Sequence, residues 1–253
     1  MRVVRPLAVI ALAGTGLSGL AACGSDPEPA KGASAPAASA PASAAVALQS
    51  LPVEEIVART RAAGEQLMST TYTVSMPGHP EGALTGTFAG DSVRGCRGGY
   101  RNEGKGSAEI LRTNAEAWLK PDADLVKAAP EIAPAAAAGK WIRLPADNYN
   151  NPKSFVSFCD LGMAVQKQVG LNTDGTVGRN LAKAGTRQVG GVAAVLVTMT
   201  DEDGTPVTYA IATEGSPRVL SADSGPGQMV LTFTGFDQKV ETALPPAGQV
   251  FQG

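Results

Sequence analysis

The stretch Val195–Ile211 reads VLVTMTDEDGTPVTYAI and decides the fold class of this chain. Apolar side chains stand at every second position from Val195 to Met199, and the same pattern returns from Val207 to Ile211. A period of two places such side chains on one face of a strand. Asp203-Gly204 lies between the two runs and is typical of a tight hairpin turn. The stretch therefore predicts two antiparallel strands that share one apolar face.

Similar patterns lie on both sides of this hairpin. Further strands or hairpins are predicted at 72–76, 84–88, 107–120, 140–144, 218–222 and 229–233. Helical spacing of apolar residues marks 50–68, 122–138 and 152–169, the second of these interrupted by Pro130 and Pro134. We therefore predict a single α+β domain over 50–253, with a mostly antiparallel sheet and helices packed on one face.

The N-terminus has the architecture of an export signal. Arg2 and Arg5 precede an apolar run from Leu7 to Leu20, which is short and glycine-rich for a transmembrane helix. The run ends in Leu20-Ala21-Ala22-Cys23, which resembles the bacterial lipobox. We predict that residues 1–22 are removed and that Cys23 carries the lipid anchor, which holds the protein at the extracytoplasmic face of the cell membrane. The alternative is an ordinary secretory signal followed by an incidental cysteine.

The segment after Cys23 and the overall charge limit the remaining possibilities. Residues 24–49 are rich in Pro, Ala and Ser without apolar periodicity, so 23–49 is predicted to be a lipidated, disordered tether. The full chain has 21 basic and 23 acidic side chains. Once Arg2 and Arg5 leave with the signal, 19 basic residues remain against 23 acidic ones, a net charge of −4. This mild acidity argues against nucleic acid as a partner.

Cys96 and Cys159 remain after lipidation of Cys23. In an oxidising compartment the simplest prediction is a disulfide between them, which would stabilise the fold by roughly 4 kcal/mol in the chain-entropy model. A zinc site would need two more ligands, and the chain has only one histidine, His79. A redox pair would usually have Cys-x-x-Cys spacing, which is absent.

Motifs that would support catalysis are weak. His79 lies in a proline-flanked turn, and no Gly-x-Ser-x-Gly elbow accompanies it. The stretch 99–106 nearly matches a phosphate-binding loop, but Gly106 replaces the Ser or Thr that would bind magnesium. The acidic run 201–204 lacks calcium-loop spacing. We therefore predict a protein that is not an enzyme and has no cofactor or bound metal.

The order of these segments along the chain resembles that of a known protein family. The segments Ala117-Trp118-Leu119-Lys120-Pro121-Asp122 and Gly139-Lys140-Trp141-Ile142-Arg143-Leu144-Pro145 are its most specific pieces, and the likeness extends from about 50 to 236. The chain resembles actinobacterial lipoproteins of the LolA-like superfamily, of LppX/LprG type. The resemblance implies a curved, mostly antiparallel half-barrel sheet over helices, with an apolar cavity between them. Members of this family are similar to carriers of lipids or acylated molecules. The resemblance therefore implies no catalytic residue in this chain.

Two functional hypotheses follow. The first is a membrane-anchored envelope lipoprotein that binds or carries a lipid or another amphiphile. Its possible cavity lining consists of apolar residues on the C-terminal strands, namely Val195, Val197, Met199, Val207, Tyr209, Ile211, Met229, Leu231 and Phe233. The alternative is a non-enzymatic envelope protein with a filled core and a surface site for a partner, because apolar strand faces are usually core. The sequence does not identify a protein partner.

Overall fold

The computed structural model describes residues 47–145 and 155–252, which belong to one compact unit, Ala45–Gly253. Cys23, the predicted signal and most of the predicted tether lie outside the described residues. Leu48–Ser50 forms a short 3-10 turn (η1) with Leu48 buried, so packing begins two residues before the predicted domain boundary. In the part of the chain that is described, no helix is both long enough and apolar enough to span a bilayer.

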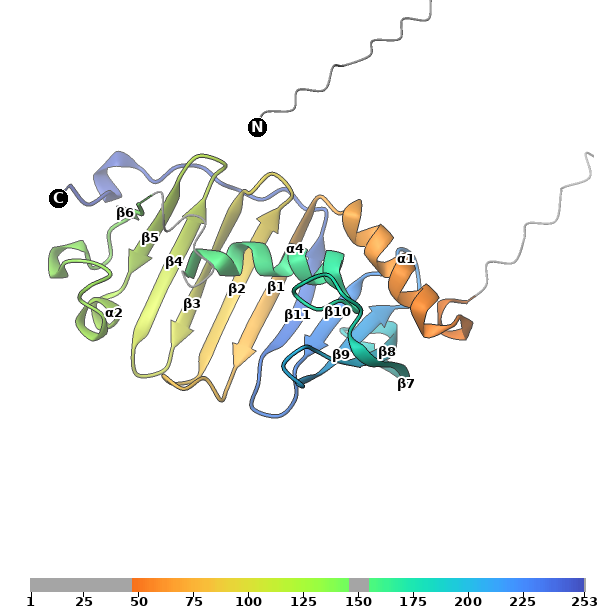
Figure 1. Ribbon diagram of the computed structural model, residues 1–253. Helices are drawn as coiled ribbons and strands as arrows, with labels where there is room; N and C mark the ends of the chain where they lie inside the picture. The colour runs from red at the N-terminus through yellow and green to blue at the C-terminus, as the bar shows by residue number, and fades with distance from the viewer. Residues whose placement is uncertain (1–46, 146–154, 253) are drawn as a thin grey trace, which may run out of the picture. The chain divides into compact units, whose positions relative to one another are not determined.

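An 11-stranded antiparallel sheet dominates the fold, and it is curved without closing (Figure 1). In space the strands follow the order β6-β5-β4-β3-β2-β1-β11-β10-β9-β8-β7, so the first and last strands of the chain meet in the middle of the sheet. Their bounds are β1 Ser69–Met76, β2 Leu84–Asp91, β3 Cys96–Asn102, β4 Gly106–Arg112, β5 Ala117–Pro121, β6 Ile142–Arg143, β7 Arg179–Val189, β8 Val192–Thr200, β9 Pro206–Ala212, β10 Val219–Asp223 and β11 Val230–Phe236.

Within residues 47–145 and 155–252 the sheet is accompanied by the α-helices α1 (Val53–Glu65), α2 (Ala123–Ala128) and α4 (Phe158–Gln168). Helix α4 lies across β1, β2 and β3 on one face of the sheet, and α1 packs against α4 and β7 (Figure 1). Short 3-10 turns are also present at η2 (Ala135–Ala137), η3 (Phe155–Ser157) and η4 (Ala247–Gln249). The face that carries the helices is called the inner face below.

Two glycines allow α4 to pack closely against the sheet and against α1. A Cβ at Gly162 would lie 2.6 Å from the ring of Tyr72 on β1, and one at Gly64 of α1 would lie 2.3 Å from the carbonyl oxygen of Gln166. The fully buried Gln166 side chain also accepts a hydrogen bond from the Val219 N–H (3.0 Å) and donates one to the Val219 carbonyl (2.8 Å). These bonds satisfy backbone groups at an irregularity in the β9–β10 pairing, so α4 also joins the sheet beyond β11.

The chain after β11 returns along the sheet. Asp237 follows β11, and its carboxylate accepts hydrogen bonds from the Met68 N–H (2.9 Å) and from Arg218 (2.5 Å). The segment then passes the strand ends to the far edge, where the Trp141 N–H donates to the carbonyl of Gln249 and the Phe251 N–H donates to that of Trp141 (Figure 1). The C-terminal segment therefore connects the middle of the sheet with its β6 edge.

The predicted fold class is confirmed, and the differences are local. The helix pattern 122–138 breaks into α2 and η2, because Pro130 and Pro134 cannot continue a helix. The predicted strand 140–144 is reduced to Ile142–Arg143. Strands β3 and β7 were not predicted. The first is rich in glycine and the second is exposed along most of its length, so neither shows a clear apolar alternation.

Candidate functional site

A pocket of about 390 Å³ opens on the inner face, beside the ends of β2, β3 and β4. Leu84 of β2, with Tyr100 and Asn102 of β3, forms its floor. The period of two within β3 brings Tyr100 and Asn102 to the same face of the sheet. This volume lies toward the lower end of the roughly 300–1,000 Å³ typical of small-molecule sites.

The walls of the pocket are mostly apolar. Leu125 of α2 and Ile132 form one side, while Phe155 of η3 and Phe158 at the start of α4 form another. The Phe155 ring stacks on Tyr100 with centroids 4.6 Å apart and an interplanar angle of 18°. This contact joins a segment before α4 to the floor, and it orients the ring of Tyr100.

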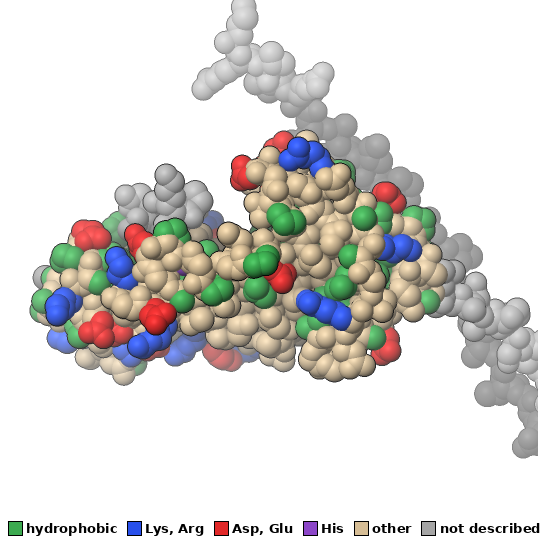
Figure 2. Space-filling view, turned by 90° about the horizontal axis from the view of Figure 1, so that it is seen from below, with side chains coloured by type: hydrophobic (Ala, Val, Ile, Leu, Met, Phe, Trp, Pro, Cys, Tyr) green, Lys and Arg blue, Asp and Glu red, His purple; other side chains and the backbone are tan. Residues whose placement is uncertain are grey.

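Charged residues stand at the rim of the pocket. His79, Glu81, Lys105 and Glu131 all contribute to its lining. The Nδ1 atom of His79 accepts a hydrogen bond from the Glu81 N–H (3.3 Å), which is the contact of a turn. Seen from below, the part of the molecule that carries α2 shows acidic and basic side chains mixed together, without a patch of one sign (Figure 2). The pocket is therefore apolar inside and of mixed charge at its mouth.

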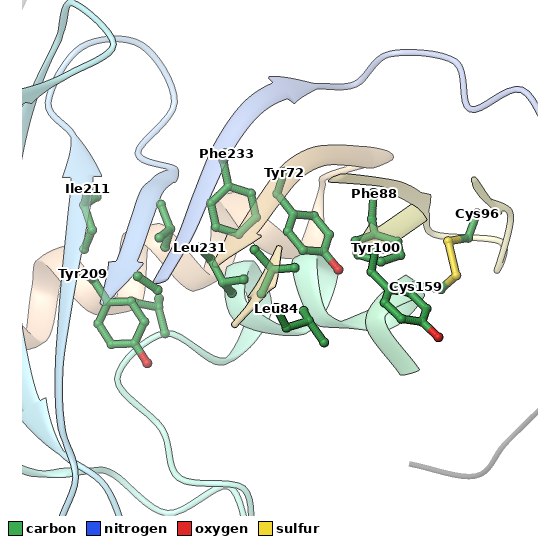
Figure 3. Close-up of a cluster of buried hydrophobic side chains, with 14 of the residues drawn as sticks. Tyr72, Leu84, Phe88, Cys96, Tyr100, Cys159, Tyr209, Ile211, Leu231 and Phe233 are labelled. Atoms are coloured by element: carbon green, nitrogen blue, oxygen red, sulfur yellow. A yellow bond between two sulfur atoms is a disulfide. The ribbon is translucent and has the colours of Figure 1, made fainter. Parts of the chain in front are cut away.

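The start of α4 is fastened to the sheet next to this pocket. The predicted disulfide is present between Cys96 of β3 and Cys159 of α4, with Cα atoms 5.5 Å apart (Figure 3). The fully buried Arg112 of β4 donates two hydrogen bonds to the Asp160 carboxylate, at 2.7 and 2.5 Å. Covalent and ionic links thus act on consecutive residues of α4 and hold Phe158 in place over the sheet.

Two tyrosines of the inner face differ in their hydroxyl environment. The Tyr72 hydroxyl donates to the carbonyl of Phe158, whereas the Tyr100 hydroxyl has no hydrogen-bond partner among the described residues. Burial, and then the nearby negative charge of Asp160, raises the pKa of Tyr72 well above its ordinary value. Burial, with Asp122 as the second cause, also raises the pKa of Tyr100 strongly. Both phenols therefore remain protonated at physiological pH.

The nine residues predicted to line a cavity lie on or next to β8, β9 and β11, in the other half of the sheet. Seven are buried in the main hydrophobic cluster, and Val207 and Met229 pack against it partly exposed (Figure 3). Val197, Ile211 and Leu231 have no exposed surface. Burial, and then the charge of Asp201, raises the pKa of Tyr209 to about 12. The 390 Å³ pocket is lined by other residues, so the lining by the C-terminal strands stays a prediction.

The sequence analysis missed the residues of this pocket. Tyr100 and Asn102 fall in the glycine-rich stretch 99–106, which was predicted from the sequence to be a turn between strands and not a phosphate-binding loop. The structure shows a hairpin there, with Asn102 ending β3 and Gly106 beginning β4. Phe155 and Phe158 lie in the predicted helical stretch 152–169, but only the fold brings them against β3.

A second depression of about 730 Å³ lies along strands β1–β5 and is more open than the first. Side chains from positions that alternate with the inner face contribute to it, including Thr73, Thr87 and Arg101. Glu109 and Lys120 also line it and form an ion pair with a distance of 2.9 Å. Within the described part of the chain, no group of three or more His, Cys, Asp or Glu residues is arranged to hold a metal ion.

Together these features define an unclosed antiparallel sheet with a pocket between its inner face and the helices. LprF from Mycobacterium bovis is 17% identical to this chain, and the match covers 76% of this chain and 96% of LprF with a TM-score of 0.50. The lipoprotein LppX from Mycobacterium tuberculosis is 16% identical, and that match covers 76% and 98% with a TM-score of 0.49. The match to LprF shows that this chain shares its fold, a curved, unclosed antiparallel sheet of LolA-like type. No protein-family model and no curated protein matches its sequence.

Proposed function

We propose that this chain is an envelope lipoprotein that binds a lipid or another amphiphile in the 390 Å³ pocket. The pocket itself is the observation that carries the proposal. Its walls of Leu125, Phe155 and Phe158 suit an acyl chain, and Tyr100 and Asn102 on its floor add the few polar groups that orient a ligand. The volume favours one acyl chain over a lipid with several chains.

The proposed location follows from the N-terminal sequence. Cys23 after Leu20-Ala21-Ala22 would carry the lipid anchor, and the segment to Gln49 would hold the domain away from the membrane surface. We expect metabolic labelling with a fatty-acid analogue to mark the wild-type chain and not Cys23→Ala. Labelling of the variant equal to that of the wild type would contradict the anchor.

A series of ligands tests the pocket. The full chain, freed of co-purifying lipid, would be titrated with saturated acyl methyl esters of increasing length, in competition with a fluorescent acyl probe. Each methylene buried is worth about 0.8 kcal/mol, so affinity should rise roughly fourfold per methylene until the pocket is full. Absence of binding at every chain length would reject the proposal.

The second candidate is an interaction protein that uses the 730 Å³ depression on the sheet. The hydroxyl and charged side chains of Thr87, Arg101 and Lys120 favour a polar partner over a lipid. In that case the titration should show no dependence on chain length. Substitution of Arg101 by Ala should then impair recovery of a partner by cross-linking in cells, while an unchanged cross-linking pattern would reject this second candidate.

A further inference from the structure

Two buried polar atoms of the pocket have no hydrogen-bond partner among the described residues. They are the hydroxyl oxygen of Tyr100 and the amide oxygen of Asn102. The two residues are only 4% and 7% exposed, and both line the pocket floor. A buried polar group without a partner costs free energy, so such groups are rare in native proteins unless something else satisfies them. Two of them on one strand therefore point to an occupant of the pocket.

Both residues belong to the inner face of β3. Tyr100 and Asn102 are two residues apart on β3, so their side chains project from the same face of one strand. Stacking on Phe155 orients the Tyr100 ring. On the same face, the Tyr72 hydroxyl donates a hydrogen bond to the carbonyl of Phe158. Burial alone therefore does not explain why the Tyr100 hydroxyl lacks a partner.

The two groups impose complementary requirements on an occupant. The amide oxygen of Asn102 accepts hydrogen bonds, whereas the Tyr100 hydroxyl can donate one as well as accept. A hydrocarbon end satisfies neither group. An ionised carboxylate has no donor for Asn102, and burying its charge without a cation beside it is costly. Among the described lining residues, the lysine is Lys105. It belongs to the turn at the rim and not to the floor where Tyr100 and Asn102 lie.

We infer that the pocket takes an amphiphile with an uncharged headgroup that both donates and accepts hydrogen bonds, such as the glycerol ester of a monoacylglycerol. This inference rests on the proposed function and specifies its ligand class. One free glycerol hydroxyl would accept from Tyr100, the other would donate to Asn102, and the acyl chain would lie against Phe155 and Phe158.

Competition binding to the lipid-free full chain tests the inference with monopalmitoylglycerol and methyl palmitate, which share the acyl chain and the ester. Wild-type protein should bind monopalmitoylglycerol about tenfold more tightly, a typical return for two satisfied hydrogen bonds. Tyr100→Phe and Asn102→Leu should each reduce that ratio severalfold and leave methyl palmitate affinity nearly unchanged. Tyr72→Phe is the matched control and should keep the wild-type ratio.

The unfolding midpoint of the ligand-free variants gives a second measurement. Tyr100→Phe removes an unsatisfied hydroxyl, so its midpoint should equal or exceed that of the wild type, whereas Tyr72→Phe should unfold more easily. Equal affinities of wild-type protein for the two esters, or an unchanged ratio in Tyr100→Phe and Asn102→Leu, would overturn the inference and leave lipid binding intact. Failure of both esters to bind at all would reject the proposed function together with the inference.

Discussion

The two halves of the sheet, β1–β6 and β7–β11, use the same inner face in different ways. In the first half the face carries aromatic rings and glycines, and a Cβ at Gly98 would lie only 2.4 Å from the Phe88 ring. The second half carries branched aliphatic residues such as Val197 and Ile211, both fully buried. The 390 Å³ pocket lies in the first half. The pocket is lined by the rings of Tyr100, Phe155 and Phe158, whereas Val197 and Ile211 are packed without exposed surface.

The helices also cover the two halves of the sheet differently. Helix α4 spans both halves, with Gly162 against Tyr72 at one point and Gln166 bonded to Val219 at another. Its start is fixed by the disulfide at Cys159, and the adjoining wall is only the six-residue α2. Helix α4 thus lies mainly over β1, β2 and β3 and reaches the aliphatic half near its end, and the short α2 leaves the pocket open at the edge of the aromatic half.

Removal of the disulfide is the largest expected effect on this arrangement. A double variant, Cys96→Ser with Cys159→Ser, should lose about 3–4 kcal/mol of unfolding free energy in urea, because the unfolded chain gains conformational freedom. The loss should centre on the aromatic half, so amide exchange should accelerate at the start of α4 more than in β8–β10. The wild type under reducing conditions is the matched control. An unchanged urea midpoint after reduction would contradict the prediction.

A pair of tryptophan substitutions compares the two halves directly. Val197→Trp should overpack the aliphatic half and destabilise the protein by about 1–3 kcal/mol without weakening acyl binding. Ala129→Trp, in the pocket wall, should change stability by less than about 0.5 kcal/mol and weaken binding at least tenfold. Thermal unfolding and competition titration would be measured on both variants.

The opposite result for this pair would also be informative. Loss of binding in Val197→Trp at little cost in stability would place the cavity among the C-terminal strands, as the sequence analysis predicted. The pair therefore decides which half of the inner face holds the ligand.

The sequence predicted the aliphatic half better than the aromatic half, and the reason is physical. Strands β8 and β9 alternate Val, Met, Tyr and Ile with threonine around Asp203-Gly204, so their period is visible locally. In β3 the inner position at Gly98 is filled by a ring from Phe88, so the alternation is absent from the strand itself. Strand β7 is an exposed edge without a buried face. The disulfide was predictable from the number of cysteines and the compartment.

The pocket could not have been predicted in the same way. Tyr100 and Phe155 are 55 positions apart in the sequence and meet only through tertiary packing. A missing hydrogen bond, as at Asn102, is a property of the folded arrangement and leaves no trace in composition or periodicity. The resemblance to a known family implied a cavity between the sheet and the helices. The position of the cavity depends on the lengths of the segments that cover the sheet, such as the short helix α2.

The smallest expected effect lies at the seam between the halves, where β1 pairs with β11. Hydrogen bonding from the Met68 N–H is the main cause that lowers the pKa of Asp237, and Arg218 adds to it against the opposing effect of burial. A carboxyl whose pKa is lower in the folded state adds stability above its unfolded pKa of about 3.9, and that stability is lost as the pH falls through the folded value.

Asp237→Asn should therefore lower unfolding free energy by less than about 1 kcal/mol at pH 7, since the site is partly exposed to solvent. The difference between variant and wild type in urea unfolding should persist at pH 5 and shrink as the pH falls below the unfolded pKa, because protonation removes the charge that the folded state stabilises. A difference that stays constant down to pH 2 would show that the Asp237 charge does not stabilise this seam.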